Sequence, residues 1–170
     1  MKKIKKNGYS LVEIIVYLAI FTTLSVLVIN SFVIVLCAFN TTRSNRNLLE
    51  SGSLAMERIS REIRQASSVD IANSVMGSNP GVLQLNSTNS VGTAMIVKFV
   101  VGNGALNIYK DGVLVGNLLG QNILVDNLIF RRITTINGEA VKIELTLEDS
   151  GSKISRLENF YDTIILRGAY

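Results

Sequence analysis

The sequence predicts an α+β protein in which one long N-terminal helix packs on an antiparallel β-sheet. A stretch without any charged residue runs from Ile14 to Phe39. Apolar residues then recur at spacings mostly of three or four as far as Ala66, which is the period of an amphipathic helix. The rest of the chain alternates short β-rich runs with glycine- and asparagine-containing turns, a pattern typical of antiparallel strands.

The first element is a short basic segment, residues 1–8, with the sequence MKKIKKNG. The formal net charge of the chain is +4, and the four lysines of this segment account for all of it. Residues 9–170 therefore carry no net charge. For that reason the basic character of the whole chain does not indicate a nucleic-acid partner.

The second element is the apolar stretch, which we predict to be a transmembrane helix within residues 9–39. Ile14 to Phe39 would form a helix of roughly 39 Å, long enough to cross a bilayer. The lysines ahead of it predict a cytoplasmic N-terminus. An ordinary cleaved signal peptide would have a shorter apolar core that ends in small residues, and no such site follows this stretch. We expect Cys37, the only cysteine, to face lipid or a packing neighbour.

The junction between these two elements reads Gly8-Tyr9-Ser10-Leu11-Val12-Glu13. A carboxylate beside an apolar span costs a few kcal/mol if it enters the membrane without a partner. The simplest explanation of Glu13 is a solvated position among the lipid headgroups. Taken with the basic leader and the length of the apolar run, however, the junction resembles the prepilin peptidase motif of type IV pilins and type II secretion pseudopilins.

The resemblance implies a role for three residues of the junction. Gly8 would be the last leader residue, and prepilin peptidase would cut between Gly8 and Tyr9. Tyr9 would be the first mature residue and would be N-methylated. Glu13 would be the fifth mature residue and would pair with the α-amino group of a neighbouring subunit, because buried opposite charges cost less together than alone. Many major pilins have proline at the twenty-second mature position, where this chain has Asn30.

The third element continues the helix in amphipathic form over about residues 40–67, which gives one helix from about Ser10 to Ser67. Glutamate–arginine pairs four residues apart support its polar face, and Gly52 weakens it by about 1 kcal/mol relative to alanine. The expected apolar stripe consists of Leu48, Leu49, Met56, Ile59, Ile63 and Ala66.

Arginines recur every three residues near the end of this helix, at Arg58, Arg61 and Arg64. Such a row could bind phosphate, but Glu57 and Glu62 are interleaved with it, which favours a solvated helix face. This part of the helix also resembles PilW-type minor pilins and the J-type minor pseudopilin of type II secretion.

The β-rich part covers about residues 82–170 and follows a loop-like segment at 70–81. Asp111-Gly112 predicts a two-residue hairpin turn of type I′, and Asn137-Gly138 predicts a second turn. We expect one antiparallel sheet of six or seven strands. The expected strands are 82–85, 94–101, 106–110, 113–115, 123–133, 141–148 and 163–167.

Residues that could carry chemistry are scarce. The chain has no histidine and a single cysteine, which excludes nucleophile–histidine pairs and the usual zinc ligand sets. Gly102-Asn103-Gly104 is too short to cradle phosphate and is better explained as a tight turn. Asp149-Ser150-Gly151 is a weak signal for calcium. We therefore expect no enzyme activity, no catalytic residue, no cofactor and no metal.

These observations and the resemblance together lead to an expected function. The chain would be a minor pilin or pseudopilin, with a leader at 1–8, a transmembrane and filament-core helix at 9–39, and an extracytoplasmic domain at 40–170. It would cross the cytoplasmic (inner) membrane once and then enter a type IV pilus or a type II secretion pseudopilus. Implied partners are prepilin peptidase, other pilin or pseudopilin subunits, and the inner-membrane assembly platform and ATPase.

Two alternatives remain open at this point. A competence-type pilin would bind DNA, or an adhesive tip subunit would bind another ligand. DNA binding needs a basic patch, whereas Arg131 and Arg132 are adjacent and would point to opposite faces of a strand, so we do not expect nucleic-acid binding. The other alternative is a signal-anchored membrane domain without a filament role.

Overall fold

The computed structural model describes residues 10–89, 91–135, 138–151 and 155–166. The chain divides into two units, Met1–Thr42 and Arg43–Tyr170. Within the described residues, the first unit consists of the N-terminal part of helix α1. The second unit contains the rest of α1 together with all the strands.

Helix α1 spans Leu11–Gln65, a length of 55 residues, and confirms the predicted long helix to within two residues at each end. It contains no proline. The carbonyl of Ser10 accepts hydrogen bonds from the backbone N–H groups of Glu13 (2.9 Å) and Ile14 (3.2 Å), as expected for serine at a helix N-cap. Arg64 lies in the last turn, where a positive charge favours the helix dipole.

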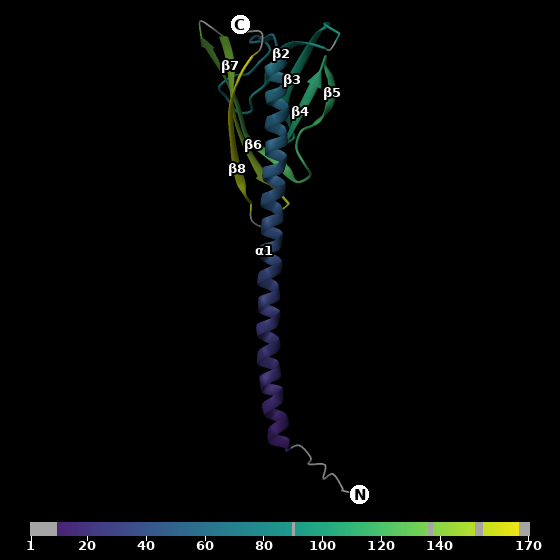
Figure 1. Cartoon of the computed structure of the whole chain (residues 1–170), viewed down its shortest axis with the longest axis vertical. Coiled ribbons are helices and arrows are strands. Elements are labelled where there is room, and N and C mark those ends of the chain that lie inside the picture. Colours follow the sequence, from purple (N-terminus) through teal and green to yellow (C-terminus); the bar gives the residue numbers. More distant parts are fainter. Residues whose placement is uncertain (1–9, 90, 136–137, 152–154, 167–170) are drawn as a thin grey trace. The chain divides into compact units, whose positions relative to one another are not determined.

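The strands form two antiparallel sheets, where we had expected one (Figure 1). The first has the order β1-β2-β3-β4-β5 and the second the order β6-β7-β8. In the view of Figure 1 they lie on either side of the C-terminal half of α1. The strands are β1 (Ser68–Val69), β2 (Leu83–Thr88), β3 (Ala94–Gly102), β4 (Ala105–Lys110), β5 (Val113–Asn117), β6 (Ile123–Thr135), β7 (Gly138–Asp149) and β8 (Leu157–Ile165).

Two hairpin turns of the first sheet use residues in the left-handed region. Asp111 (φ 49°) and Gly112 (φ 80°) join β4 to β5, which confirms the predicted type I′ turn. Asn103 (φ 54°) and Gly104 (φ 75°) join β3 to β4 in the same way. The segment 102–104 is therefore a tight turn, as predicted.

The last strand was placed wrongly by the sequence pattern. β8 covers Leu157–Ile165, whereas we expected 163–167, and Arg167 lies outside the described residues. The first part of β8 does not alternate between apolar and polar residues, so the sequence pattern does not indicate a strand there. Its apolar or aromatic residues Leu157 and Tyr161 are in fact exposed. Conversely, Asp162 accepts a hydrogen bond from the Ser60 hydroxyl of α1 (2.9 Å), so an acidic residue faces the helix.

The core of the second unit lies between α1 and the inner faces of both sheets. β7 shows the predicted alternation, since Val141, Ile143, Leu145 and Leu147 are all fully buried. The other largest fully buried side chains are Phe99, Phe130, Ile59, Ile63, Leu83, Leu85, Leu106, Ile108 and Leu128. The ring of Phe160 on β8 lies directly over Gly52, which allows strand and helix to approach closely.

The loop that follows β1 covers the outer edge of β6. The backbone N–H groups of Gly77 and Gly81 donate to the carbonyls of Phe130 (2.8 Å) and Leu128 (2.7 Å). A Cβ at Gly81 would lie 2.9 Å from the Leu128 carbonyl oxygen, so glycine is needed at this contact. The loop thereby satisfies backbone groups that would otherwise be open to another chain.

Candidate functional site

The most unusual surface of the protein is the N-terminal part of α1. An 18-residue window of this helix has a mean hydropathy of 2.4, and none of it is buried inside the protein. From Leu11 to Phe39 the large hydrophobic side chains are between 46% and 75% exposed. Water disfavours an apolar surface of this extent, so the helix is compatible with a single-pass membrane anchor.

The small hydroxyl side chains of this part of the helix hydrogen-bond to its own backbone. Thr22 and Thr23 donate to the carbonyl of Ala19 (2.9 and 3.1 Å). Ser25 donates to Phe21 (2.8 Å) and Ser31 to Leu27 (2.9 Å). Because lipid offers no hydrogen-bond partners, this internal pairing suits a helix that crosses a membrane.

Glu13 lies in the first turn of α1, where a negative charge favours the helix dipole. The Tyr17 hydroxyl donates to its Oε1 at 3.3 Å. Sequence reasoning missed this contact, although the four-residue spacing on a helix could have indicated it. Gly8 and Tyr9, the other two predicted site residues, lie outside the described residues.

A buried ion cluster lies in the second unit, between α1 and the first sheet. Glu62 Oε1 accepts from Arg58 Nη2 at 2.9 Å and from Lys110 Nζ, at the end of β4, at 3.0 Å. The Glu62 side chain is only 3% exposed, and its Oε2 has no partner within the described residues. We had placed Glu62 on the solvated face of the helix. That placement was wrong because Lys110 contributes a second cation that only the folded sheet provides.

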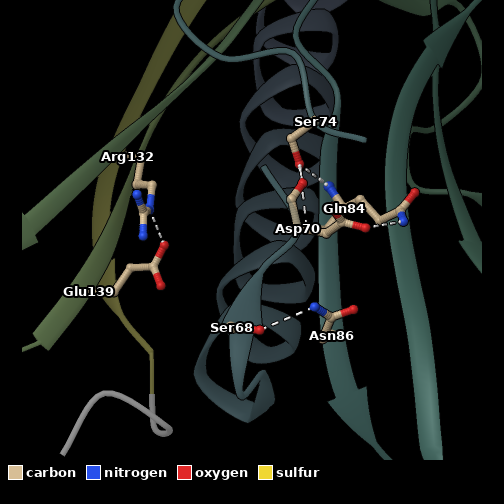
Figure 2. A network of polar contacts seen from close by, with 7 residues as sticks. All are labelled: Ser68, Asp70, Ser74, Gln84, Asn86, Arg132 and Glu139. Atoms are coloured by element: carbon tan, nitrogen blue, oxygen red, sulfur yellow. Dashed lines mark hydrogen bonds and ion pairs between the residues drawn. The ribbon is translucent and has the colours of Figure 1, made fainter. Parts of the chain in front are cut away.

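A second polar cluster ties the loop after β1 to β2 (Figure 2). The side chain of Gln84 donates to Asp70 Oδ2 at 2.8 Å, as Figure 2 shows. The side chain of Asn73 donates to the same oxygen, also at 2.8 Å. The Asn73 side chain, followed by further hydrogen bonds from Asn73 and Gln84, lowers the pKa of Asp70. The Ser74 hydroxyl donates to the Asp70 carbonyl at 2.6 Å. The Asp70 carboxylate is the only carboxylate of this cluster, and its partners belong to the same loop and to β2. The cluster therefore holds the loop against β2.

Charged side chains on the second sheet are paired with one another. Glu144 accepts from Arg131 (3.1 Å) and Lys142 (2.9 Å). Lys142 and then Arg131 lower the pKa of Glu144. Arg132 pairs with Glu139 (Figure 2). The two adjacent arginines therefore contact different carboxylates.

The remaining candidate for chemistry was the segment Asp149-Ser150-Gly151. The Asp149 carboxylate accepts from the Ser44 hydroxyl of α1 and from the backbone N–H of Gly151 at 2.8 Å, so it anchors this turn to the helix. Among the described residues, no group of three or more His, Cys, Asp or Glu side chains could hold a metal ion.

Comparisons of the chain with protein-family models, with curated proteins and with solved structures gave no match. The candidate site is therefore defined by the geometry of the chain itself. It consists of the exposed apolar part of α1 and the carboxylate of Glu13 at its beginning.

Proposed function

We propose that this chain is a minor pilin or pseudopilin, a structural and assembly subunit of a type IV pilus or a type II secretion pseudopilus. The observation that carries the proposal is the exposed apolar part of α1. Such a helix is stable in lipid, and after leaving the membrane it must be covered by other apolar helices. A bundle of equivalent helices from sister subunits provides that cover.

Glu13 supports a filament role over a simple membrane anchor. It is the only charged residue from Ser10 to Thr42, next to a span where an uncompensated charge is costly. Cleavage between Gly8 and Tyr9 would release an α-amino group close to it in sequence. The ammonium group of one subunit could then pair with the carboxylate of the next, which would set the axial register during assembly.

The proposed partners follow from this pathway. Prepilin peptidase would trim the leader, and an inner-membrane platform with its ATPase would move the subunit from the membrane into the filament. The domain at residues 40–170, which includes the amphipathic part of α1, would lie outside the cytoplasmic membrane, since the leader lysines favour a cytoplasmic N-terminus.

Replacing Gly8 by leucine should prevent trimming, because the proposed peptidase site needs a small residue there. In cells with a filament system, intact-mass measurement should find the parent chain without residues 1–8 and with one methyl group on Tyr9. Gly8→Leu should keep Met1 to Gly8. Gly116→Leu is a matched control, because a Cβ at Gly116 meets nothing within 4 Å. Normal trimming of Gly8→Leu would refute the cleavage assignment, and an untrimmed parent chain would favour a simple signal anchor.

Replacing Glu13 by alanine should leave membrane insertion intact, since it removes the only charged residue from Ser10 to Thr42 and keeps the leader lysines. Incorporation into filaments should fall at least about tenfold, which corresponds to the loss of roughly 1.4 kcal/mol of pairing energy. Quantitative immunoblotting of sheared filaments against membranes measures this ratio. Glu57→Ala, which removes a glutamate with a 64% exposed side chain from the same helix, should incorporate normally. Equal incorporation of both variants would contradict the pairing role.

DNA binding is the weaker candidate, because two of the three arginines in the row on α1 are paired with acids. Arg58 contacts Glu62, Arg61 contacts Glu57, and the cations of the second sheet pair as described above. A DNA-binding surface needs cations that are free to neutralise phosphates. DNA binding by the full chain that weakens steeply with salt would favour this alternative.

A further inference from the structure

Asn30 lies in the middle of the exposed apolar part of α1 and differs from the other polar side chains there. The hydroxyl groups of this part donate to backbone carbonyls, and Tyr17 donates to Glu13. The Asn30 side chain is exposed, and within the described residues it makes no hydrogen bond. A carboxamide has two donor hydrogens and an acceptor oxygen, and all of them would face lipid.

A lipid-facing carboxamide is costly unless another polar group reaches it at the same depth. Within the described residues, no group of this chain's own apolar segment pairs with the Asn30 side chain, because the nearby hydroxyls donate to backbone carbonyls. At a rise of roughly 1.5 Å per residue, Glu13 lies about 26 Å from Asn30 along the helix axis, and Tyr17 lies about 20 Å from it. A second helix at the same depth in the membrane could supply the missing partner of Asn30.

The residues in line with Asn30 on the helix are small, β-branched or polar. With alternate spacings of four and three, they form a row of 3.5-residue period, which is the period of two helices that pack along each other. Small side chains in such a row let two backbones approach closely in a membrane. Leucine, isoleucine and aromatic residues lie outside it. The row consists of Ala19, Thr23, Val26, Asn30, Val33, Cys37 and Asn40.

We propose that two copies of this chain pair in the membrane as parallel helices through Asn30. Copies inserted in the same orientation carry Asn30 at the same depth, and a two-fold axis places each Asn30 opposite its counterpart. The carboxamide is self-complementary, so each donates to the other. This pairing requires only that α1 is inserted in a membrane. It requires neither cleavage of the leader nor filament assembly.

The pairing row and the proposed assembly residue lie on different sides of α1. Glu13 precedes Asn30 by seventeen residues, which puts it about 100° around the helix at roughly 100° per residue. The pair of chains therefore leaves Glu13 outside the Asn30 contact. Such a pair would be a membrane-resident form of the subunit before it joins a filament.

Cys37 provides a direct test, because it follows Asn30 by seven residues on the same row and is the only cysteine. The full chain is placed in bacterial membranes that lack a filament system and is oxidised with copper phenanthroline, which converts two facing thiols to a disulfide. Parallel pairing brings the two Cys37 residues within the short range that a disulfide requires. We expect a dimer of twice the 18.6 kDa chain mass that reducing agent dissociates.

Three variants determine whether Asn30 causes the contact. Asn30→Val should weaken dimerisation about 5- to 30-fold, the range expected for one interhelical polar contact in a membrane. Ser31→Val removes a neighbouring polar group that is already satisfied and should crosslink as the parent chain does. In Cys37→Ser with Phe39→Cys, the thiol moves to about 180° from Asn30, and crosslinking should be lost.

Absence of a disulfide dimer in the parent chain would overturn the proposal, as would undiminished crosslinking of Asn30→Val. Equal crosslinking at Phe39→Cys would show random collision and would also overturn it. Because the membranes lack a filament system, these results do not depend on the trimming of Gly8 or on the role of Glu13. The two proposals can therefore fail separately.

Discussion

Replacing Gly52 by alanine is expected to destabilise the folded domain by about 2 kcal/mol, even though alanine is the better helix former. Alanine gains about 1 kcal/mol in helix propensity. Its Cβ, however, would lie 2.1 Å from Cζ and 2.3 Å from Cε2 of the Phe160 ring. Overpacking of this kind costs about 1–3 kcal/mol and occasionally more. Because the clash involves the ring itself, we expect it to outweigh the gain in propensity.

The effect of Gly52→Ala on the free energy of unfolding should change sign once the Phe160 ring is removed. In a Phe160→Ala background, Gly52→Ala meets no ring and should stabilise the protein by up to about 1 kcal/mol. Urea unfolding of the full chain in detergent, followed by circular dichroism, gives the four free energies of this cycle. Ser53→Ala, at an exposed position of the same helix, is the control for propensity alone. Additive effects of Gly52→Ala and Phe160→Ala would contradict the predicted contact.

Replacing Lys110 by methionine is expected to cost about 2–3 kcal/mol. Among the described residues, the change leaves the buried carboxylate of Glu62 with Arg58 as its only partner. A buried charge that loses a partner is strongly destabilising. We expect a value below the 3–5 kcal/mol typical of a broken buried pair because Arg58 remains. The same urea unfolding experiment measures the loss.

Two further variants separate the buried cluster from ordinary surface pairing. Arg61→Met breaks a pair with Glu57 whose side chains are 53% and 64% exposed, and it should cost less than about 1 kcal/mol. Adding Glu62→Met to Lys110→Met removes the buried charge and should recover most of the stability, since an apolar replacement of a buried pair is often neutral. If Lys110→Met and Arg61→Met lower the free energy of unfolding by the same amount, that result would contradict the prediction that the burial of Glu62 makes the loss of Lys110 more costly.

Features that depend on neighbours in sequence could be predicted from the sequence itself. The extent of α1 follows from an unbroken helical pattern without proline, and its apolar beginning follows from composition. The turn at Asp111-Gly112 follows from two residues that tolerate positive φ. The alternation along β7 follows from one buried and one solvated face of a sheet. Each of these properties depends on residues that are close together in the sequence, so it can be predicted without knowledge of the tertiary structure.

Features that depend on distant residues were decided by the tertiary structure. Two sheets form in place of one because their inner faces pack against the same half of α1. Gly52 looked like a weak point of the helix, and only the approach of Phe160, more than one hundred positions later, explains it. Glu62 looked like a solvated glutamate until Lys110 came within 3.0 Å of it. The same is true of the apolar N-terminal part of α1. Its composition predicts a membrane helix, but only the structure shows that the Asn30 side chain makes no hydrogen bond within the described residues. Whether a polar group finds a partner depends on which atoms the fold brings within reach.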